Sequence, residues 1–217
     1  MEIIKKEHND YPKKLKQLYD SPKQIYIEGN RKILDSDSIA IIGSRVCSKY
    51  GASMAYNFGY ELAKKGIVII SGLARGIDSY AHLGAVSAKG KTIAVLGSGL
   101  KNIYPKENLG LCREILKYGG AIITEYNINE KPEKKNFPAR NRIISGLSNG
   151  VLVVEAKKKS GTLITVDFSL DYGKDIFCIP GNITSEYSYN TNELIKQGAI
   201  LVTNVNEIIE YMKCHNM

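Results

Sequence analysis

The sequence predicts an α/β protein built on a doubly wound, mostly parallel sheet, and two observations carry that prediction. From Asp37 to the end of the 217-residue chain, short runs rich in Val, Ile and Leu alternate with helical patterns. The runs are continuously apolar, which is typical of strands that are buried on both faces. Regular alternation of such strands with helices favours a parallel sheet whose ligands bind at the carboxyl ends of the strands.

The predicted strands are short apolar runs bounded by glycine, at Ile39–Ile42, Ile67–Ile70, Thr92–Leu96, Ala121–Thr124, Val151–Val154 and Asp175–Ile179, with a weaker one at Ile200–Val202. The predicted helices lie between and after them, at about residues 50–65, 76–89, 106–118, 138–148, 162–173, 190–197 and 204–213. Asn127–Asn136 is the longest irregular piece, and a loop of that length in a compact domain usually has a function.

Residues 1–36 form a lead whose pattern differs from that of the main domain, residues 37–217. Tyr11–Tyr19 predicts one short helix, and Gln24–Glu28 alternates like a strand. Because this is too little to fold alone, we expect the lead to pack on the main domain.

Composition and charge limit the class of protein. Thirty Lys and Arg against twenty-two Asp and Glu give a net charge of +8, which is compatible with a polyanionic partner. The four cysteines stand far apart and histidines are few, so we expect reduced thiols in a cytoplasmic protein and no metal site. No segment has the pattern of a signal peptide or the length of a membrane span, so we expect no membrane partner.

Loops with phosphate-binding chemistry follow the predicted strands. They combine glycine, hydroxyl and cationic residues: Gly43-Ser44-Arg45, Ser71-Gly72-Leu-Ala-Arg75-Gly76, Gly97-Ser98-Gly99 and Lys157-Lys-Lys159-Ser160-Gly161-Thr162. Glycine lets a backbone approach a phosphate closely, and the other groups donate hydrogen bonds to it. Each loop alone is explained as well by a turn that needs a positive φ. Together at one sheet edge they predict an anion-lined cleft.

Asn136–Ser148 predicts a basic, amide-rich helix start. Arg140, Asn141 and Arg142 follow Phe137-Pro138, and the apolar residues behind them require burial as a helix. Pro138 suits a first helical position, where unsatisfied N–H groups and the helix dipole favour anions. The alternative is a surface turn whose arginines are solvated.

The sequence lacks the patterns of the common catalytic and cofactor sites. The third glycine of G-x-G-x-x-G is missing, and so is the Lys-Ser/Thr pair of a P-loop. Asp78 and His82 would share a helix face as carboxylate and base, but capping and packing is the favoured interpretation. Glu125 could be a base, and we prefer a loop-capping role. We therefore expect a protein that is not an enzyme and needs no cofactor or metal.

The order of these motifs resembles the DNA-processing protein A family (DprA, also called Smf) over about residue 10 to the end. The matching stretches are Ile41-Ile-Gly-Ser-Arg45, Ser71–Asp78 with Ala81-His82, Ile93–Gly97 with Tyr104-Pro105 and Asn108, Asn136–Ser148, Val151–Glu155, Ser160–Thr165 and Ile179-Pro-Gly181. The resemblance implies an extended Rossmann-like domain that binds single-stranded DNA, helps to load the RecA recombinase in natural transformation, and forms a homodimer.

By this resemblance and by the loop chemistry, the residues expected to bind DNA are Gly43, Ser44, Arg45, Ser71, Gly72, Arg75, Gly76, Lys134, Lys135, Asn136, Phe137, Arg140, Asn141, Arg142, Ser160, Gly161 and Thr162. Cations and amides would track the phosphates, while Phe137 would either stack on an unstacked base or pack in the core.

The chain departs from the family pattern in several places. Many members carry an N-terminal SAM-like domain and a C-terminal winged-helix domain, and neither is evident here, which makes the chain resemble a minimal member. Asn190 stands where the family usually has glycine. The alternative function is a nucleotide-binding sensor or nucleoside-monophosphate hydrolase of the related lysine-decarboxylase-like group. That group resembles Pro-Gly-Gly-x-Gly-Thr-x-x-Glu, and Thr165 occupies the Glu position.

Overall fold

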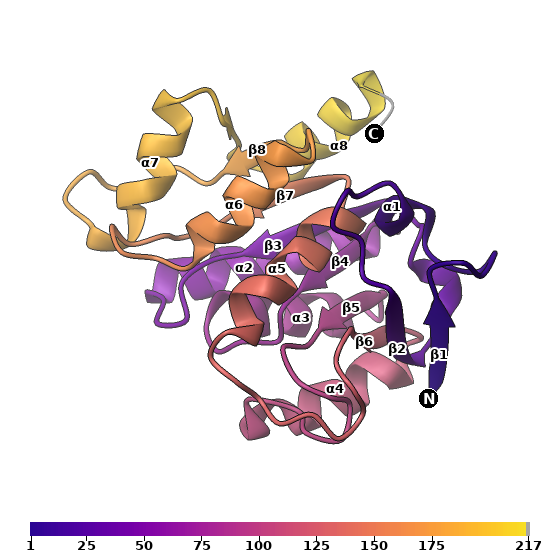
Figure 1. The fold of residues 1–217 in the computed structure, drawn as a ribbon. Coiled ribbons are helices and arrows are strands. Elements are labelled where there is room, and N and C mark those ends of the chain that lie inside the picture. The colour runs from indigo at the N-terminus through magenta and orange to yellow at the C-terminus, as the bar shows by residue number, and fades with distance from the viewer. Residues whose placement is uncertain (216–217) are drawn as a thin grey trace.

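Nine strands form one sheet in the computed structural model, which describes residues 1–215 (Figure 1). Seven of them pair in parallel, in the spatial order β6-β5-β4-β3-β7-β8-β9. Their bounds are β3 Ser38–Ile42, β4 Val68–Ser71, β5 Thr92–Val95, β6 Ala121–Thr124, β7 Gly150–Val153, β8 Asp175–Cys178 and β9 Ile200–Leu201. The predicted doubly wound, Rossmann-like sheet is confirmed.

The order of the strands reverses between β3 and β7. From β3 the chain moves outward in one direction through β4, β5 and β6, and then returns to place β7 beside β3. Ala40 of β3 is paired with Ile70 of β4 on one side and with Val151 of β7 on the other. In open α/β sheets the crevice at such a reversal is where ligands bind, because the loops on either side of it diverge.

Helices cover both faces of the sheet (Figure 1). On one face lie α2 Lys49–Lys64, α3 Ile77–Ser87, α4 Leu109–Lys117 and α8 Val205–Cys214. On the other lie α1 Lys13–Lys16, α5 Asn136–Leu147, α6 Thr162–Asp171 and α7 Tyr189–Lys196. Along β3, Ile39 and Ile41 face the first layer, whereas Ala40 and Ile42 face the second. Burial on both faces is the reason for the continuous apolar runs.

Three short 3-10 helices, η1 Arg31–Ile33, η2 Lys106–Asn108 and η3 Glu186–Ser188, complete the elements. One expectation about local structure was wrong, and one strand was not anticipated. Helix α5 begins at Asn136, not at Pro138, which the first turn accommodates because its N–H groups have no carbonyl partner within the helix. The strand β1, Glu2–Lys5, was not predicted, because only Ile4 of its four residues is buried and its apolar signal is weak.

The lead of residues 1–36 joins the same sheet and the same core. Strand β2, Gln24–Gly29, pairs antiparallel with β6, and β1 pairs antiparallel with β2. The buried side chains of Leu15 and Leu18 pack on α5 at Gly146, where an added Cβ would overlap Leu18. The lead therefore supports the rear of α5, the helix whose first turns face the crevice.

Replacing Leu15 with alanine should lower the free energy of unfolding by about 2–5 kcal/mol, because it leaves a cavity between the lead and α5. Urea denaturation followed by circular dichroism measures this. The control is Lys13→Ala in the same helical turn, whose side chain is exposed and whose loss should change stability by less than about 0.5 kcal/mol. Equal effects of the two substitutions would show that the lead contributes little to the core.

Candidate nucleic-acid interface

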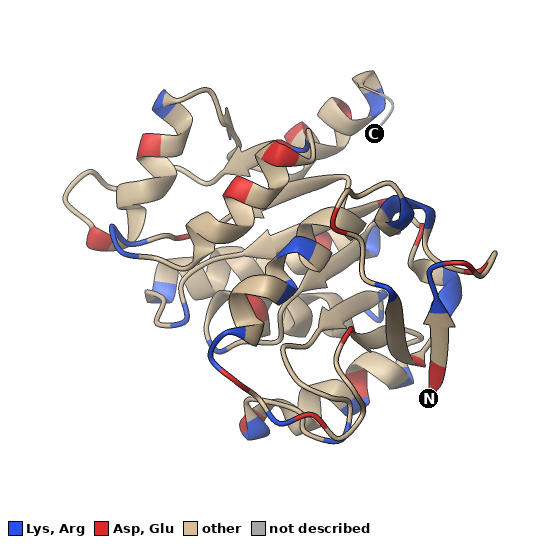
Figure 2. Cartoon of the chain, in the orientation of Figure 1, with Lys and Arg blue, Asp and Glu red and all other residues tan. Residues whose placement is uncertain are grey.

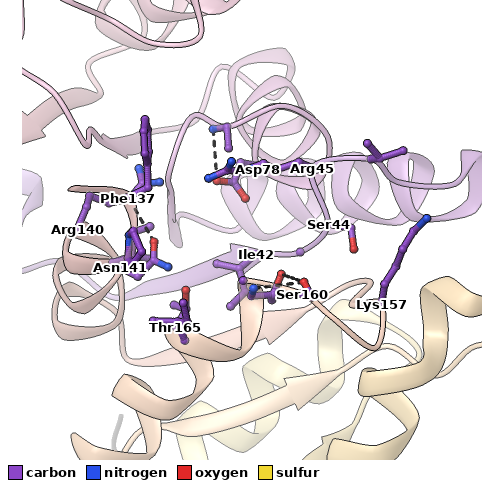
Figure 3. A pocket seen from close by; sticks show the side chains of 18 of the residues that line it. Ile42, Ser44, Arg45, Asp78, Phe137, Arg140, Asn141, Lys157, Ser160 and Thr165 are labelled. Atoms are coloured by element: carbon purple, nitrogen blue, oxygen red, sulfur yellow. Dashed lines mark hydrogen bonds between the residues drawn. The ribbon is translucent and has the colours of Figure 1, made fainter. Parts of the chain in front are cut away.

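A pocket of about 460 Å³ opens at the carboxyl ends of β3 and β7, at the reversal of the strand order. Four segments surround it: the loop after β3, the loop between β4 and α3, the first turns of α5, and the loop that leads from β7 into α6. Figure 3 shows Phe137, Arg140 and Asn141 on one side, Ser44 and Lys157 on the other, and Ser160 and Thr165 below. The structure thus brings loops from distant parts of the chain to one site.

The loop after β3 is held close to the end of β7. The Ser44 N–H donates to the carbonyl of Glu155 over 2.9 Å, and Gly43 fits where a Cβ would lie 2.6 Å from the Ile77 side chain. This tight turn leaves the Arg45 side chain exposed, with its guanidinium carbon 5.5 Å from the centre of the Phe137 ring. Within residues 1–215 no carboxylate forms an ion pair with Arg45. Arg45 is therefore a cation that a ligand can reach.

Glu155 stabilises the fold, a role that its place at the end of the Val151–Glu155 motif did not predict. Its buried carboxylate accepts hydrogen bonds from the Ser48 N–H, over 2.9 Å, and from the Ser48 hydroxyl, over 2.5 Å. The Ser48 hydroxyl oxygen in turn accepts from the N–H of Gly51 in the first turn of α2. The two sides of the crevice are thereby tied together beneath the pocket.

The loop between β4 and α3 is ordered by Asp78, and its predicted DNA-binding residues do not line the pocket. The buried Asp78 carboxylate accepts from the N–H groups of Gly72 and Ala74, over 3.1 and 3.4 Å. The Ser71 hydroxyl is buried and donates to the carbonyl of Ile41 over 2.7 Å. Gly76 has a φ of 73°, and an added Cβ would overlap the carbonyl of Ser44. These residues shape the loop, and Ala74 and Asp78 reach the pocket.

Arg140 was expected to offer its guanidinium to a phosphate, but the structure buries it. The residue is 3 % exposed. Its guanidinium donates hydrogen bonds to the carbonyl of Gly72, at a distance of 2.6 Å, and to the carbonyl of Val95. An added Cβ at Gly72 would overlap this group, so the glycine makes room for it. Burial lowers the pKa of Arg140 to about 10, and the neighbouring Asp78 carboxylate opposes that change. Arg140 is thus part of the pocket wall, and its Nη1 is already engaged by the two carbonyls.

Arg142 lies outside the pocket. Its guanidinium donates to both carboxylate oxygens of Glu125, each over 2.6 Å, and lies 3.4 Å from the Asp20 carboxylate of the lead. Glu125 is therefore the partner of Arg142, which accounts for it without a role as a base. Lys134 and Lys135 are exposed on the preceding loop, where Lys135 pairs with Glu133, and neither lines the pocket.

Phe137 both packs and faces the pocket. The half-buried ring lies over Gly97, where a Cβ would be 2.9 Å from it, and tilts against Tyr104 with 5.7 Å between ring centres. The Gly97-Ser98-Gly99 loop does not line the pocket, although Gly97 lies beneath this ring. Asn136 is buried beside it, and Asn141 lines the pocket one turn further along α5.

The loop after β7 brings a second group of cations. Ser160, Gly161 and Thr162 line the pocket at the start of α6, together with Lys157 and Lys159. Both lysines were missing from the predicted site, although three successive lysines were visible in the sequence. Lys157 pairs with Glu186 over 2.8 Å, whereas no ion pair engages Lys159 within the part of the chain that the structure describes. Lys159, Arg45 and the N-terminus of α6 make the pocket attractive to anions.

The remaining polar candidates serve the fold. His82 Nδ1 lies 2.7 Å from the Thr92 hydroxyl in the core, and burial lowers the pKa of this imidazole to about 3. Asp78 and His82 therefore have the capping and packing roles that we favoured. In residues 1–215 no cluster of His, Cys, Asp and Glu is arranged to hold a metal ion. No helix in the same range has the length and apolar character needed to cross a bilayer.

The net positive charge is not gathered on one face. Figure 2 shows Lys and Arg spread over many elements and interspersed with Asp and Glu. Attraction for an anion at the pocket consequently depends on the few cations that line it without an acidic partner, and not on the net charge of +8.

The fold and this pocket define a Rossmann-like α/β protein with a crevice at the reversal of its sheet that is lined in part by Lys and Arg. Residues 2–213 match the family described as DNA recombination-mediator protein A. The chain belongs to this family, as the resemblance predicted.

Named relatives support the assignment. The chain is 44 % identical to protein Smf of Escherichia coli over 211 residues, covering 97 % of this chain and 56 % of that protein. It is 43 % identical to DNA processing protein DprA of Streptococcus pneumoniae over 199 residues, or 92 % of this chain and 70 % of that one. The chain thus spans little more than half of the E. coli relative.

A solved structure of DprA from Helicobacter pylori, from a study of its single-stranded DNA binding mode, superposes with a TM-score of 0.86. It is 32 % identical, and the match covers 98 % of this chain and 99 % of that one. The X-ray structure of S. pneumoniae DprA superposes with a TM-score of 0.90 at 42 % identity, over 96 % of this chain and 73 % of that one.

Arg140→Met should lower the free energy of unfolding by about 3–5 kcal/mol, because it leaves Asp78 and two carbonyls buried without their cation. Arg45→Ala removes the same charge from an exposed position and should change stability by less than about 0.5 kcal/mol. Urea denaturation of both variants checks this. A stable Arg140→Met protein would mean that the buried guanidinium is not needed to hold the pocket wall.

Proposed function

We propose that this chain is a non-enzymatic protein that binds single-stranded DNA through the pocket between β3 and β7. The observation that carries the proposal is the exposed, unpaired Arg45 beside the half-buried Phe137 at the reversal of the sheet. A cation next to an accessible aromatic ring matches a strand whose phosphates need charge and whose unstacked bases need a flat apolar surface. The single-stranded DNA binding described for the H. pylori relative supports it.

The proposed contacts follow from the geometry of the pocket. Gly43, Ser44 and Arg45 would hold one phosphate, and Lys159 with the Ser160-Gly161-Thr162 start of α6 would hold another. Phe137 would present its free face to a base. Paired bases within a duplex stack on one another and cannot offer that face, so the arrangement favours a single strand.

The biological setting is proposed from the family. DprA proteins are DNA-processing proteins by name and the family is one of recombination mediators, which supports a role in protecting incoming single strands and loading RecA in natural transformation. We further propose a homodimer and a cytoplasmic location, in which the four unpaired thiols would stay reduced. Light scattering of the purified chain, with and without RecA and oligo-dT, tests the partners.

The nucleotide sensor or hydrolase alternative has no support from the family or from the named relatives. Thr165, which stands where that enzyme group has glutamate, lines the pocket with a hydroxyl and not an acid. Asp78 is the carboxylate that lines the pocket, but it is buried beside Arg140 and accepts hydrogen bonds from backbone N–H groups, so it is not placed to act as a catalytic acid.

Labelled oligo-dT should bind more tightly than a duplex of the same length, and AMP should compete only weakly. If about four phosphates are neutralised, log K should fall against log salt with a slope near −3, at roughly −0.7 per contact. Fluorescence anisotropy across a salt series measures both. Equal affinity for the duplex, or an affinity that salt does not change, contradicts the proposal.

Arg45→Ala should weaken oligo-dT binding by ~1–3 kcal/mol, because it removes a charge-assisted contact. Arg113→Ala is the matched control: it removes the same charge from an exposed position on α4, outside the pocket. The same anisotropy assay compares them. Wild-type affinity in Arg45→Ala, or equal losses in the two variants, would place the phosphate contacts elsewhere.

A further inference from the structure

A second, smaller hollow lies next to the pocket and has no place in the function proposed above. Its volume is about 40 Å³, and it is bounded by Arg45, Gly72, Ala74, Arg75, Tyr104, Pro105 and Phe137. Arg45, Ala74 and Phe137 line both cavities, so the hollow continues the pocket across the Phe137 ring. At this size it has room for a few water molecules, each of which needs about 10–15 Å³ of such space, and it cannot enclose a base. It can only offer a surface.

Tyr104 is the aromatic part of that surface. The residue is 42 % exposed, and its ring centre lies 5.7 Å from that of Phe137 at an interplanar angle of 56°. Most large aromatic side chains that serve the core lose much more of their surface to water. An exposed ring at the rim of an anion-binding pocket is suited to stack on a base.

The backbone around Tyr104 is anchored independently of its ring. Pro105 is buried, and the side chain of Asn108 at the end of η2 donates to the Leu73 carbonyl and to the Ser79 hydroxyl, each over 2.8 Å. These bonds fix η2 to the loop between β4 and α3. The backbone next to Tyr104 is therefore held without any contribution from the ring, which is one way in which a binding surface is preorganised.

Arg75 supplies a cation to the same hollow, and Glu107 holds it in the free protein. The Arg75 guanidinium donates two hydrogen bonds to the Glu107 carboxylate, and the one from Nη2 is 2.9 Å long. Both side chains are more than half exposed. An exposed pair of this kind contributes little to stability, so a phosphate can replace the carboxylate at small cost. A guanidinium fork fits phosphate and carboxylate equally well.

We propose that Tyr104 and Arg75 form a second nucleotide subsite, which takes the unit of the strand next to the one in the pocket. Tyr104 stacks on the base, Arg75 binds the phosphate, and Glu107 is the internal anion that this phosphate displaces. The inference rests on the proposed function, because it extends the path of a single strand beyond Phe137. It assigns to Glu107 a role that weakens binding.

The first test compares Tyr104→Ala with Tyr104→Phe on labelled (dT)8. Loss of a stacked base should weaken binding about fivefold or more in Tyr104→Ala, whereas Tyr104→Phe keeps the ring and should stay within about twofold of wild type. Circular dichroism melts verify that both variants are folded. Equal affinity of all three proteins refutes the stacking role.

Photo-cross-linking separates contact from positioning, because Tyr104 also touches Phe137. A single 5-iodouracil is moved through (dT)8, and the cross-linked peptides are identified by mass spectrometry. The expected result is a cross-link to Tyr104 from a position adjacent to one that reaches the Phe137 peptide. If Tyr104→Ala weakens binding but no position cross-links to Tyr104, the residue only supports Phe137 and the subsite is refuted.

The second test removes the competing anion. Glu107→Gln should bind (dT)8 more tightly at low salt, and its log K against log salt slope should steepen by up to roughly 0.7, because the variant frees no carboxylate that takes up a salt cation when the phosphate binds Arg75. Glu114→Gln on α4 is the control, since it removes one exposed carboxylate that pairs with Lys117 outside both cavities. An unchanged slope in Glu107→Gln, or the same change in both variants, refutes the displacement of Glu107 from Arg75 by a phosphate.

The wild-type measurement tells the two failures apart. If the wild-type protein does not bind (dT)8, the proposed function fails and the subsite with it. If it binds, and Arg45→Ala weakens binding while the Tyr104 and Glu107 variants behave as wild type, only the second subsite is wrong.

Discussion

The buried guanidinium of Arg140 is the interaction on which the site depends. From α5 it donates to carbonyls at the ends of β4 and β5, and it lies beside the carboxylate of Asp78, which in turn orders the loop after β4. A buried charge is tolerated only when it is paired and fully hydrogen-bonded, so these segments must adopt one arrangement together. That arrangement places Phe137 and Asn141 at the pocket and keeps Nη1 of Arg140 bonded to the two carbonyls, while Arg140 itself forms part of the pocket lining.

The cations of the chain fall into two groups that charge counting does not distinguish. Arg140 and Arg142 are buried or half-buried against carbonyls and carboxylates, and they stabilise the fold. Arg45 and Lys159 stand at the pocket without an acidic partner among the described residues, and Arg75 has a partner that is exposed and exchangeable. Binding of a polyanion therefore depends on local pairing. Variants that lose the same charge at different positions would therefore differ widely in their affinity for a polyanion.

The backbone of the pocket is already ordered in the free protein. Ser44 and Ser48 bind Glu155 across the crevice, Asp78 caps the loop after β4, and Asn108 ties η2 to that loop. A strand that binds such a surface loses its own freedom but need not order the protein as well. In the proposed function, the aromatic pair Phe137 and Tyr104 is the part of this surface that would distinguish unstacked bases from a closed duplex.

The sequence by itself determined the class of fold and the segments that carry the site. Continuous apolar runs are dictated by burial on both faces, so the parallel strands and most helix positions follow from the pattern of residues along the chain. Glycine with hydroxyl and cationic residues after a strand can likewise be recognised without a structure. The partners of those residues were decided only by tertiary structure. Arg140 and Arg142 are two positions apart, which on an α-helix is a rotation of about 200°, so one faces the sheet ends and the other faces the lead. Which side is buried depends on the strand order and on where residues 1–36 pack, and both arise from contacts between residues distant in the chain.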